Sequence, residues 1–133
     1  MNYLNESLNT DPSPEQYDII ATRITPDNIR FLHALMGLQT ESAELTDMFK
    51  KHVFYGKDFD LVNLVEELGD IEWYRAIMFS WLSQKLGITA EELEARIQKT
   101  NLDKLKARYP NKFTDADANQ RNLEAEREIL ESF

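Results

Sequence analysis

The sequence predicts an all-α protein, an antiparallel helical bundle that assembles as a homo-oligomer. Its 133 residues include only four glycines and four prolines, too few for the many tight turns of a β architecture. The apolar fraction of 42% fits a folded chain. Apolar residues also recur at the helical period through most of the sequence. We therefore expect one helical domain over residues 1–133.

The N-terminal part predicts two helices. Residues 1–12 form a loose polar lead-in, and the segment SPEQYDIIATR carries a short helix with Ser13 as N-cap and Pro14 in the first position. A second helix begins near Pro26 and runs to about Phe54. Its apolar stripe consists of Phe31, Leu35, Leu38, Leu45 and Phe49.

The third predicted helix, at about 60–86, follows a break at Gly56 and takes Asp58 or Asp60 as its cap. It is apolar on nearly all sides, which predicts burial on nearly all sides. A chain of this length has few helices to surround it, so we expect a dimer or a larger assembly. One stripe contains Leu61, Leu64, Leu68, Ile71, Phe79 and Leu82, and the far side contains Tyr74, Ile77 and Trp81.

Two more helices complete the prediction. Gly87 ends the third helix, and Thr89 with Glu92 forms a capping box for the fourth. The fourth helix runs to about Arg108, where the segment RYP stops it. Residues 114–133 are expected to form a C-terminal extension, one amphipathic helix capped by Thr114.

Charge and composition exclude several classes of protein. The net charge of −9 disfavours non-specific binding to nucleic acid or to an anionic membrane. The sequence shows neither a membrane-spanning apolar run of about 20 residues nor a signal peptide. The lack of cysteine excludes disulfides and thiol catalysis and fits a cytoplasmic protein. Two histidines argue against a His-rich zinc site.

Two acidic steps stand out beside apolar stripes. Glu41 and Glu44 form a Glu-x-x-Glu step, and Glu67 and Asp70 form a Glu-x-x-Asp step. Residues three apart on a helix differ by about 60° in azimuth, so each pair projects from one face. The short connection between the two helices favours antiparallel neighbours, whose four carboxylates would meet across the seam. Asp47 falls nearly opposite the stripe and is expected to be solvated.

Four crowded negative charges are costly unless protons or cations offset them. Mg²⁺ suits such a set because it binds a few carboxylates and shares its remaining positions with water and phosphate, and Mn²⁺ is a substitute. A di-iron bundle would need Glu-x-x-His steps, which these helices do not contain. The alternative is a set of solvated or ion-paired acids.

A polar line on the fourth helix points to phosphate. Leu93 and Ile97 begin its inward stripe, and Asn101, Lys104 and Arg108 continue it. One interpretation is the usual cationic C-terminal turn, with long side chains that extend to solvent. The other is a clamp for the phosphates of a di- or triphosphate, which an acidic protein cannot otherwise hold.

Three further sets of residues have both a functional and a structural interpretation. Lys51 lies on the same side as the first acidic step and reaches either phosphate or solvent. Glu66 lies beside the second step and is an outer ligand, a base or a surface acid. Trp73, Tyr74 and Trp81 stack on a nucleobase or pack in the core or a subunit interface.

The segments GLQTESAEL, NLVEELGDIEWY and NLDKLKARYPNKFT together resemble the MazG-like, all-α nucleoside triphosphate pyrophosphohydrolases. The signature of that family is Glu-x-x-Glu followed by Glu-x-x-Asp, and residues 45–66 separate the two steps by a length usual for it. The resemblance covers about residues 29–113. The tail ADANQRNLEAEREIL is similar to the extension of compact, single-domain versions from bacteria and phages.

The resemblance implies a dimeric or tetrameric enzyme that cleaves a nucleotide between its α and β phosphates, releasing a nucleoside monophosphate and pyrophosphate for nucleotide-pool house-cleaning. One carboxylate also takes the proton of the attacking water, and Glu41 is our choice. The implied magnesium ligands are Glu41, Glu44, Glu67 and Asp70, and the implied phosphate contacts are Asn101, Lys104 and Arg108.

Two alternatives remain at this point. The first is a hydrolase of the same fold that acts on dUTP or on a nucleoside diphosphate alone, since base-reading contacts cannot be assigned from sequence. The second is a non-catalytic helical module that binds a nucleotide or a partner protein. The crowded carboxylates argue against this second alternative, because a scaffold gains nothing from them.

Overall fold

The computed structural model describes residues 3–133 as helices joined by short loops, with no strand among them. The predicted all-α class is confirmed. The chain divides into two compact units, one up to Met78 and the other from Phe79. No helix within the described part has the length and apolar character needed to cross a membrane. The helices are α1 (Tyr3–Leu8), α2 (Pro14–Ala21), α3 (Pro26–Tyr55), α4 (Leu61–Leu86), α5 (Ala90–Arg108), α6 (Asp115–Asn119) and α7 (Leu123–Glu131).

The helix starts follow the capping residues that the sequence predicts. The Ser13 side chain accepts a hydrogen bond from the Gln16 amide, and the Gln16 side chain accepts one from the Ser13 amide, which makes a complete capping box at α2. Thr89 caps α5 as predicted, and Thr25, which was not predicted as a cap, caps α3 ahead of Pro26. Local sequence therefore determines where these helices begin.

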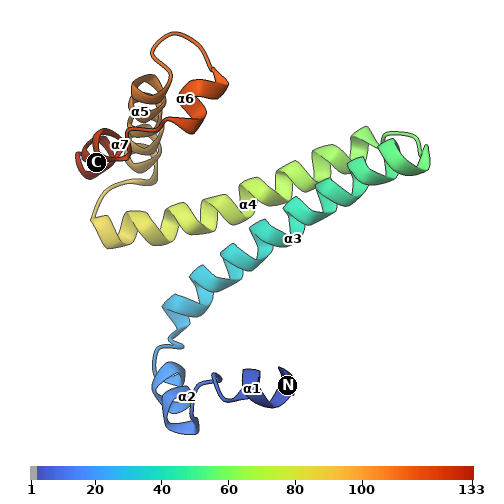
Figure 1. The fold of residues 1–133 in the computed structure, drawn as a ribbon, viewed down its shortest axis with the longest axis vertical. Helices are drawn as coiled ribbons and strands as arrows, with labels where there is room; N and C mark the ends of the chain where they lie inside the picture. Colours follow the sequence, from blue (N-terminus) through green and yellow to red (C-terminus); the bar gives the residue numbers. More distant parts are fainter. Residues whose placement is uncertain (1–2) are drawn as a thin grey trace. The chain divides into compact units, whose positions relative to one another are not determined.

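A tight connection folds α3 and α4 into an antiparallel hairpin (Figure 1). Gly56 ends α3 with φ at 64°, in the left-handed region that glycine adopts without steric cost. Between the two predicted caps of the next helix, the structure selects Asp60. Its carboxylate accepts hydrogen bonds from the backbone N–H groups of Val62 and Asn63.

Close packing of a glycine against an aromatic ring holds the hairpin together. Gly37 of α3 is buried, and the ring of Tyr74 from α4 lies directly over it, in the space that a Cβ would fill. The ring of His33 meets that of Tyr74 edge-on, with 5.5 Å between centroids. Near the connection, the rings of Phe49 and Phe59 pack at 5.9 Å. Tyr74 therefore serves in packing, whereas its neighbour Trp73 remains exposed.

The hairpin leaves much apolar surface uncovered within one chain. Val62 and Val65 of α4 are 80% and 70% exposed, and Phe54 of α3 is 76% exposed. The sequence predicts burial of α4 on nearly all sides, and this chain alone does not provide it. Other exposed apolar residues of the hairpin include Leu32, Leu35, Met36, Val53, Leu61 and Leu68.

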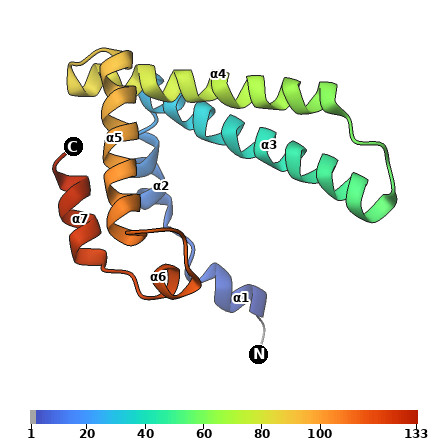
Figure 2. The same ribbon diagram turned by 90° about the horizontal axis from the view of Figure 1, so that it is seen from above.

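The second unit contains a small core between α5 and α7, which pack side by side (Figure 2). Leu93 of α5 is completely buried. The expectation of a single helix over residues 114–133 is wrong. Gln120 ends α6, and the Asn122 side chain starts α7 by accepting a hydrogen bond from the Ala125 amide. The loose lead-in at residues 1–12 likewise contains α1.

The Gly37 contact generates a stability prediction. Gly37→Ala should lower the free energy of unfolding by about 1–3 kcal/mol, because the new methyl group overlaps the Tyr74 ring and outweighs the helical preference of alanine. The matched control is Gly69→Ala on α4, where a Cβ meets nothing within 4 Å. That change should raise stability by up to about 1 kcal/mol. Urea denaturation of both variants measures the difference, and equal shifts would contradict the packing role of Gly37.

Candidate metal centre

Three of the four predicted carboxylates come together across the hairpin. Glu41 projects from α3, and Glu67 and Asp70 project from α4, with one oxygen of each within 4.8 Å of the others. Glu67 is only 6% exposed, Glu41 is half-buried and Asp70 is exposed. The cluster is therefore covered on one side and open to solvent on the other.

Neighbouring side chains orient two of these carboxylates. The Asn63 amide, one helical turn before Glu67, donates a hydrogen bond of 2.5 Å to its Oε1. The Thr40 hydroxyl lies 3.2 Å from Oε1 of Glu41 and 2.9 Å from the carbonyl oxygen of Gly37. Polar partners of this kind fix the direction of a ligand before a metal arrives.

The cluster carries negative charge that nothing within it offsets. Burial raises the pKa of the Glu41 carboxyl, a hydrogen bond with Glu67 raises it further, and the charges of Glu44 and Glu67 act in the same direction. The hydrogen bond from Thr40 opposes these effects without cancelling them. The pKa of Glu41 therefore stays above its usual range in the metal-free protein. The set consists of hard carboxylate oxygens, which fits Mg²⁺ or Mn²⁺.

Glu44 lies outside this group of three, although it is close enough to affect the pKa of Glu41. It is exposed and lines an open groove of about 400 Å³. Asn63, the residue that orients Glu67, lines the same groove, so groove and cluster adjoin. The full lining is Ala43, Glu44, Asp47, Met48, Lys51 and Asn63.

A cation in this groove is paired with an acid of its own helix. The Lys51 ammonium lies 2.7 Å from the Asp47 carboxylate, and Lys50 lies 3.5 Å from it. The hydrogen bond with Lys51 lowers the pKa of Asp47, and the same contact raises the pKa of Lys51. Asp47 was expected to be merely solvated, but the i, i+4 spacing brings it to Lys51. Glu66 is exposed and lies outside the group of three carboxylates.

The predicted phosphate contacts all lie on α5, in the second unit. Asn101 is exposed and forms part of a mostly apolar hollow of about 420 Å³, and Lys104 is half-buried. The Arg108 guanidinium is held by both oxygens of Glu126, with 2.9 Å between Nε and Oε1. The structure describes this line within its own unit, so its role toward the carboxylates stays a prediction.

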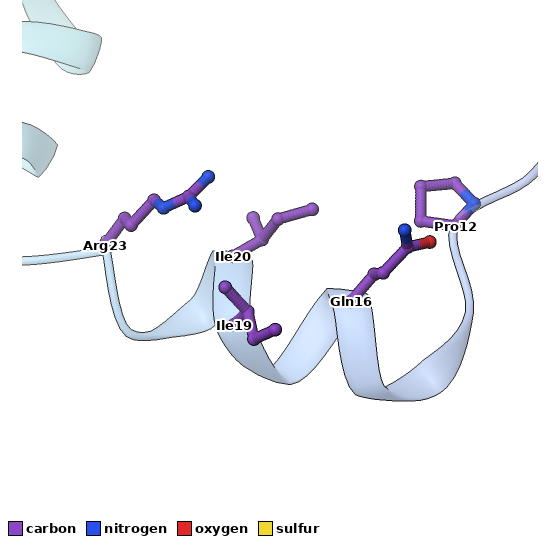
Figure 3. Close-up of a pocket in the computed structure, with 5 residues that line it drawn as sticks. All are labelled: Pro12, Gln16, Ile19, Ile20 and Arg23. Atoms are coloured by element: carbon purple, nitrogen blue, oxygen red, sulfur yellow. The ribbon is translucent and has the colours of Figure 1, made fainter.

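Another hollow, of about 360 Å³, lies along α2 (Figure 3). The five residues that line it offer apolar side chains, one amide and one guanidinium. Without a carboxylate or an imidazole they provide no ligand set for a hard cation. The lining consists of Pro12, Gln16, Ile19, Ile20 and Arg23.

Sequence reasoning missed several supporting contacts of these sites. Asn63 was visible on the Glu67 side of α4, and its i, i+4 spacing indicates the hydrogen bond that it makes. Thr40 offered no signal apart from its place beside Glu41. The pairing of Arg108 with Glu126 joins residues 18 positions apart, and no local pattern predicts it.

The raised pKa of Glu41 gives a pH prediction for the metal-free protein. Below the ordinary pKa of a glutamate, the Glu41 carboxyl is protonated in both the folded and the unfolded chain. Its ionisation then does not affect the free energy of unfolding. As pH rises through the raised folded-state pKa, folding opposes ionisation and stability falls. Glu41→Gln should therefore be more stable than the original chain at neutral pH in EDTA, and this advantage should disappear near pH 4. Thermal melts across pH test it.

Glu66→Gln is the matched control, because it removes an exposed acid of α4 from outside the cluster. A similar gain at neutral pH from both variants would show that overall negative charge, rather than the crowded cluster, limits stability.

Comparison of the chain with protein-family models, with curated proteins and with solved structures finds no match in any of the three. The resemblance in the sequence motifs therefore remains a prediction, and the function has to be argued from the residues.

Proposed function

We propose that this protein is a Mg²⁺-dependent nucleoside triphosphate pyrophosphohydrolase, which cleaves between the α and β phosphates. The observation that carries the proposal is the meeting of the Glu41, Glu67 and Asp70 carboxylates within 4.8 Å of one another. Such a cluster is costly to build in a half-buried seam unless a cation completes it. A protein with a net charge of −9 also needs a cation to approach a polyphosphate.

Each carboxylate has a place in this chemistry. Glu67, Asp70 and Glu41 would hold the ion, with Glu44 at the edge of the adjoining groove as a further ligand. When bound, Mg²⁺ would neutralise phosphate charge and lower the pKa of the attacking water. The water oxygen forms a bond to the α-phosphorus, and the bond from that phosphorus to the α–β bridging oxygen breaks, so that pyrophosphate leaves. Glu41 is the proposed acceptor for the proton of the water.

Cationic contacts for the phosphates are the next part of the proposal. Lys51 lines the groove beside the cluster, and its contact with Asp47 raises its pKa. Asn101, Lys104 and Arg108 are the proposed contacts from the second unit. In such a reaction, position and charge compensation supply most of the rate enhancement, so no nucleophilic side chain is required.

A homodimer or homotetramer belongs to the same proposal. The hairpin exposes large apolar side chains on both of its helices, among them Phe54, Val62 and Val65. Exposed apolar patches of this kind mark an interaction surface. A second copy of the chain presents the same apolar residues and can bury them in a symmetric interface.

The proposed activity is tested by product analysis. The chain is incubated with Mg²⁺ and a panel of nucleoside and deoxynucleoside triphosphates and diphosphates, and the products are separated. We expect a nucleoside monophosphate and pyrophosphate from a triphosphate. Orthophosphate with a diphosphate product would overturn the α–β cleavage. Activity on dUTP or on diphosphates alone would identify the more specific hydrolase of the same fold.

Variants connect that activity to the cluster. Glu44→Gln and Asp70→Asn should each lower turnover by about 100-fold or more while the chain stays folded, because each removes a metal-binding charge. The matched control is Glu72→Gln on α4, an exposed acid that pairs with Arg75. Full turnover in both cluster variants would reject the metal assignment. Nucleotide binding that ignores Mg²⁺, without turnover, would instead indicate a binding module.

The oligomer has a separate test. Light scattering at micromolar concentration should give a mass of at least twice 15.6 kDa. Val65→Lys should shift the mass toward that of one chain, since a charge in an apolar interface is costly. A single-chain mass for the unaltered protein would contradict the interface.

A further inference from the structure

Two arginines of the second unit hold one buried carboxylate. Arg108 of α5 donates from Nε and Nη2 to the two oxygens of Glu126. Arg121 donates to the same oxygens, at 3.3 Å from Nε and 2.7 Å from Nη2. The ring of Tyr109 lies 5.8 Å from the Arg108 guanidinium carbon. Paired guanidinium forks of this kind also recognise phosphate.

The charges of this cluster do not balance. Two guanidinium cations share one carboxylate, and the pKa of Glu126 is held at about 2, first by Arg108 and then by Arg121. One positive charge is therefore left over at physiological pH. A phosphate group with two negative charges would neutralise the pair of arginines better than Glu126 does.

The helix that carries Glu126 packs against α5, and its most buried residue is charged. Glu126 is the buried residue of α7, at 4% exposure, whereas Leu123 and Leu130 on the same helix are exposed. The most buried contact between α7 and α5 is therefore ionic. Such a contact, unlike an apolar core, can be exchanged for another anion.

Access to the two arginines is unequal. The Arg121 side chain is 43% exposed and the Arg108 side chain is 17% exposed, while Glu126 lies beneath them. An incoming anion can therefore bind Arg121 first and reach Arg108 as Glu126 leaves.

We propose that Arg108 and Arg121 form an anion site whose resident occupant is Glu126, and that a polyphosphate displaces this carboxylate and releases α7. The inference rests on the proposed function in one respect, since a nucleotide supplies the competing polyphosphate. It explains how Arg108 serves as a phosphate contact while it is paired in the structure. Glu126 then acts as an intramolecular competitor of the substrate.

Hydrogen–deuterium exchange on the full chain tests the displacement, with inorganic pyrophosphate as the probe. The experiment is done in EDTA, so that the carboxylate cluster holds no metal. Pyrophosphate should speed amide exchange in Leu123–Glu131 about tenfold or more, relative to sodium chloride at equal ionic strength, which controls for screening. Unchanged or slower exchange in this segment would overturn the proposal.

Calorimetry with pyrophosphate in EDTA gives a second readout. Glu126→Gln removes the charge of the competitor and should tighten binding about tenfold or more. Glu128→Gln, an exposed acid of the same helix, is the matched control and should leave binding unchanged. Arg121→Gln in the Glu126→Gln background should abolish the gain. An equal affinity in all variants would reject the site, and if Glu126→Gln does not fold, the exchange result decides alone.

The two proposals fail separately. A lack of turnover with Mg²⁺ would overturn the proposed activity but would not affect the proposed release of α7 by pyrophosphate. Turnover with Mg²⁺ but no release of α7 by pyrophosphate would support the proposed activity and overturn the role of Glu126 as a competitor.

Discussion

The close approach of α3 and α4 is the constraint on which the candidate metal centre depends. Tyr74 can lie against α3 only because Gly37 has no side chain. One helical turn further along α3 from Gly37 stands Glu41, and one turn before Tyr74 on α4 stands Asp70. The contact that sets the spacing of the helices therefore also brings the carboxylates within reach of one cation. The packing of α3 against α4 and the geometry of the carboxylate cluster therefore both depend on Gly37.

Crowded carboxylates show a conflict between stability and function. In the metal-free chain, burial and the hydrogen bond with Glu67 raise the pKa of Glu41, and the charges of Glu44 and Glu67 add to this effect, which a purely structural helix pair would avoid. Asn63 and Thr40 orient Glu67 and Glu41 without supplying positive charge. A cation is the component that satisfies such an arrangement, which is why the cluster supports a metal-dependent function better than a scaffold.

Local patterns predicted the parts of this structure that depend on local interactions. Pro26, Gly56 and Thr89 mark helix ends through capping and backbone conformation, which act within a few residues. The antiparallel hairpin and the meeting of the acidic steps followed from one short connection. The division of residues 114–133 into α6 and α7 was missed because the amphipathic pattern hides a break at Gln120. The Arg108–Glu126 pair was missed because side chains distant in sequence leave no periodic signal.

Under the proposed function, a polyphosphate meets cations that are already paired within this acidic chain. Lys51 is bound to Asp47, and Arg108 is bound to Glu126, so each of these candidate phosphate contacts already has an anion of its own chain. Phosphate must compete with these carboxylates for the cations. It competes best at a site where the positive charge exceeds the charge that the resident carboxylate neutralises. At Arg108 the second guanidinium of Arg121 provides that excess. At Lys51 the second cation is Lys50, which lies 3.5 Å from the same Asp47 carboxylate, and a cation in the adjoining candidate metal centre would add further positive charge.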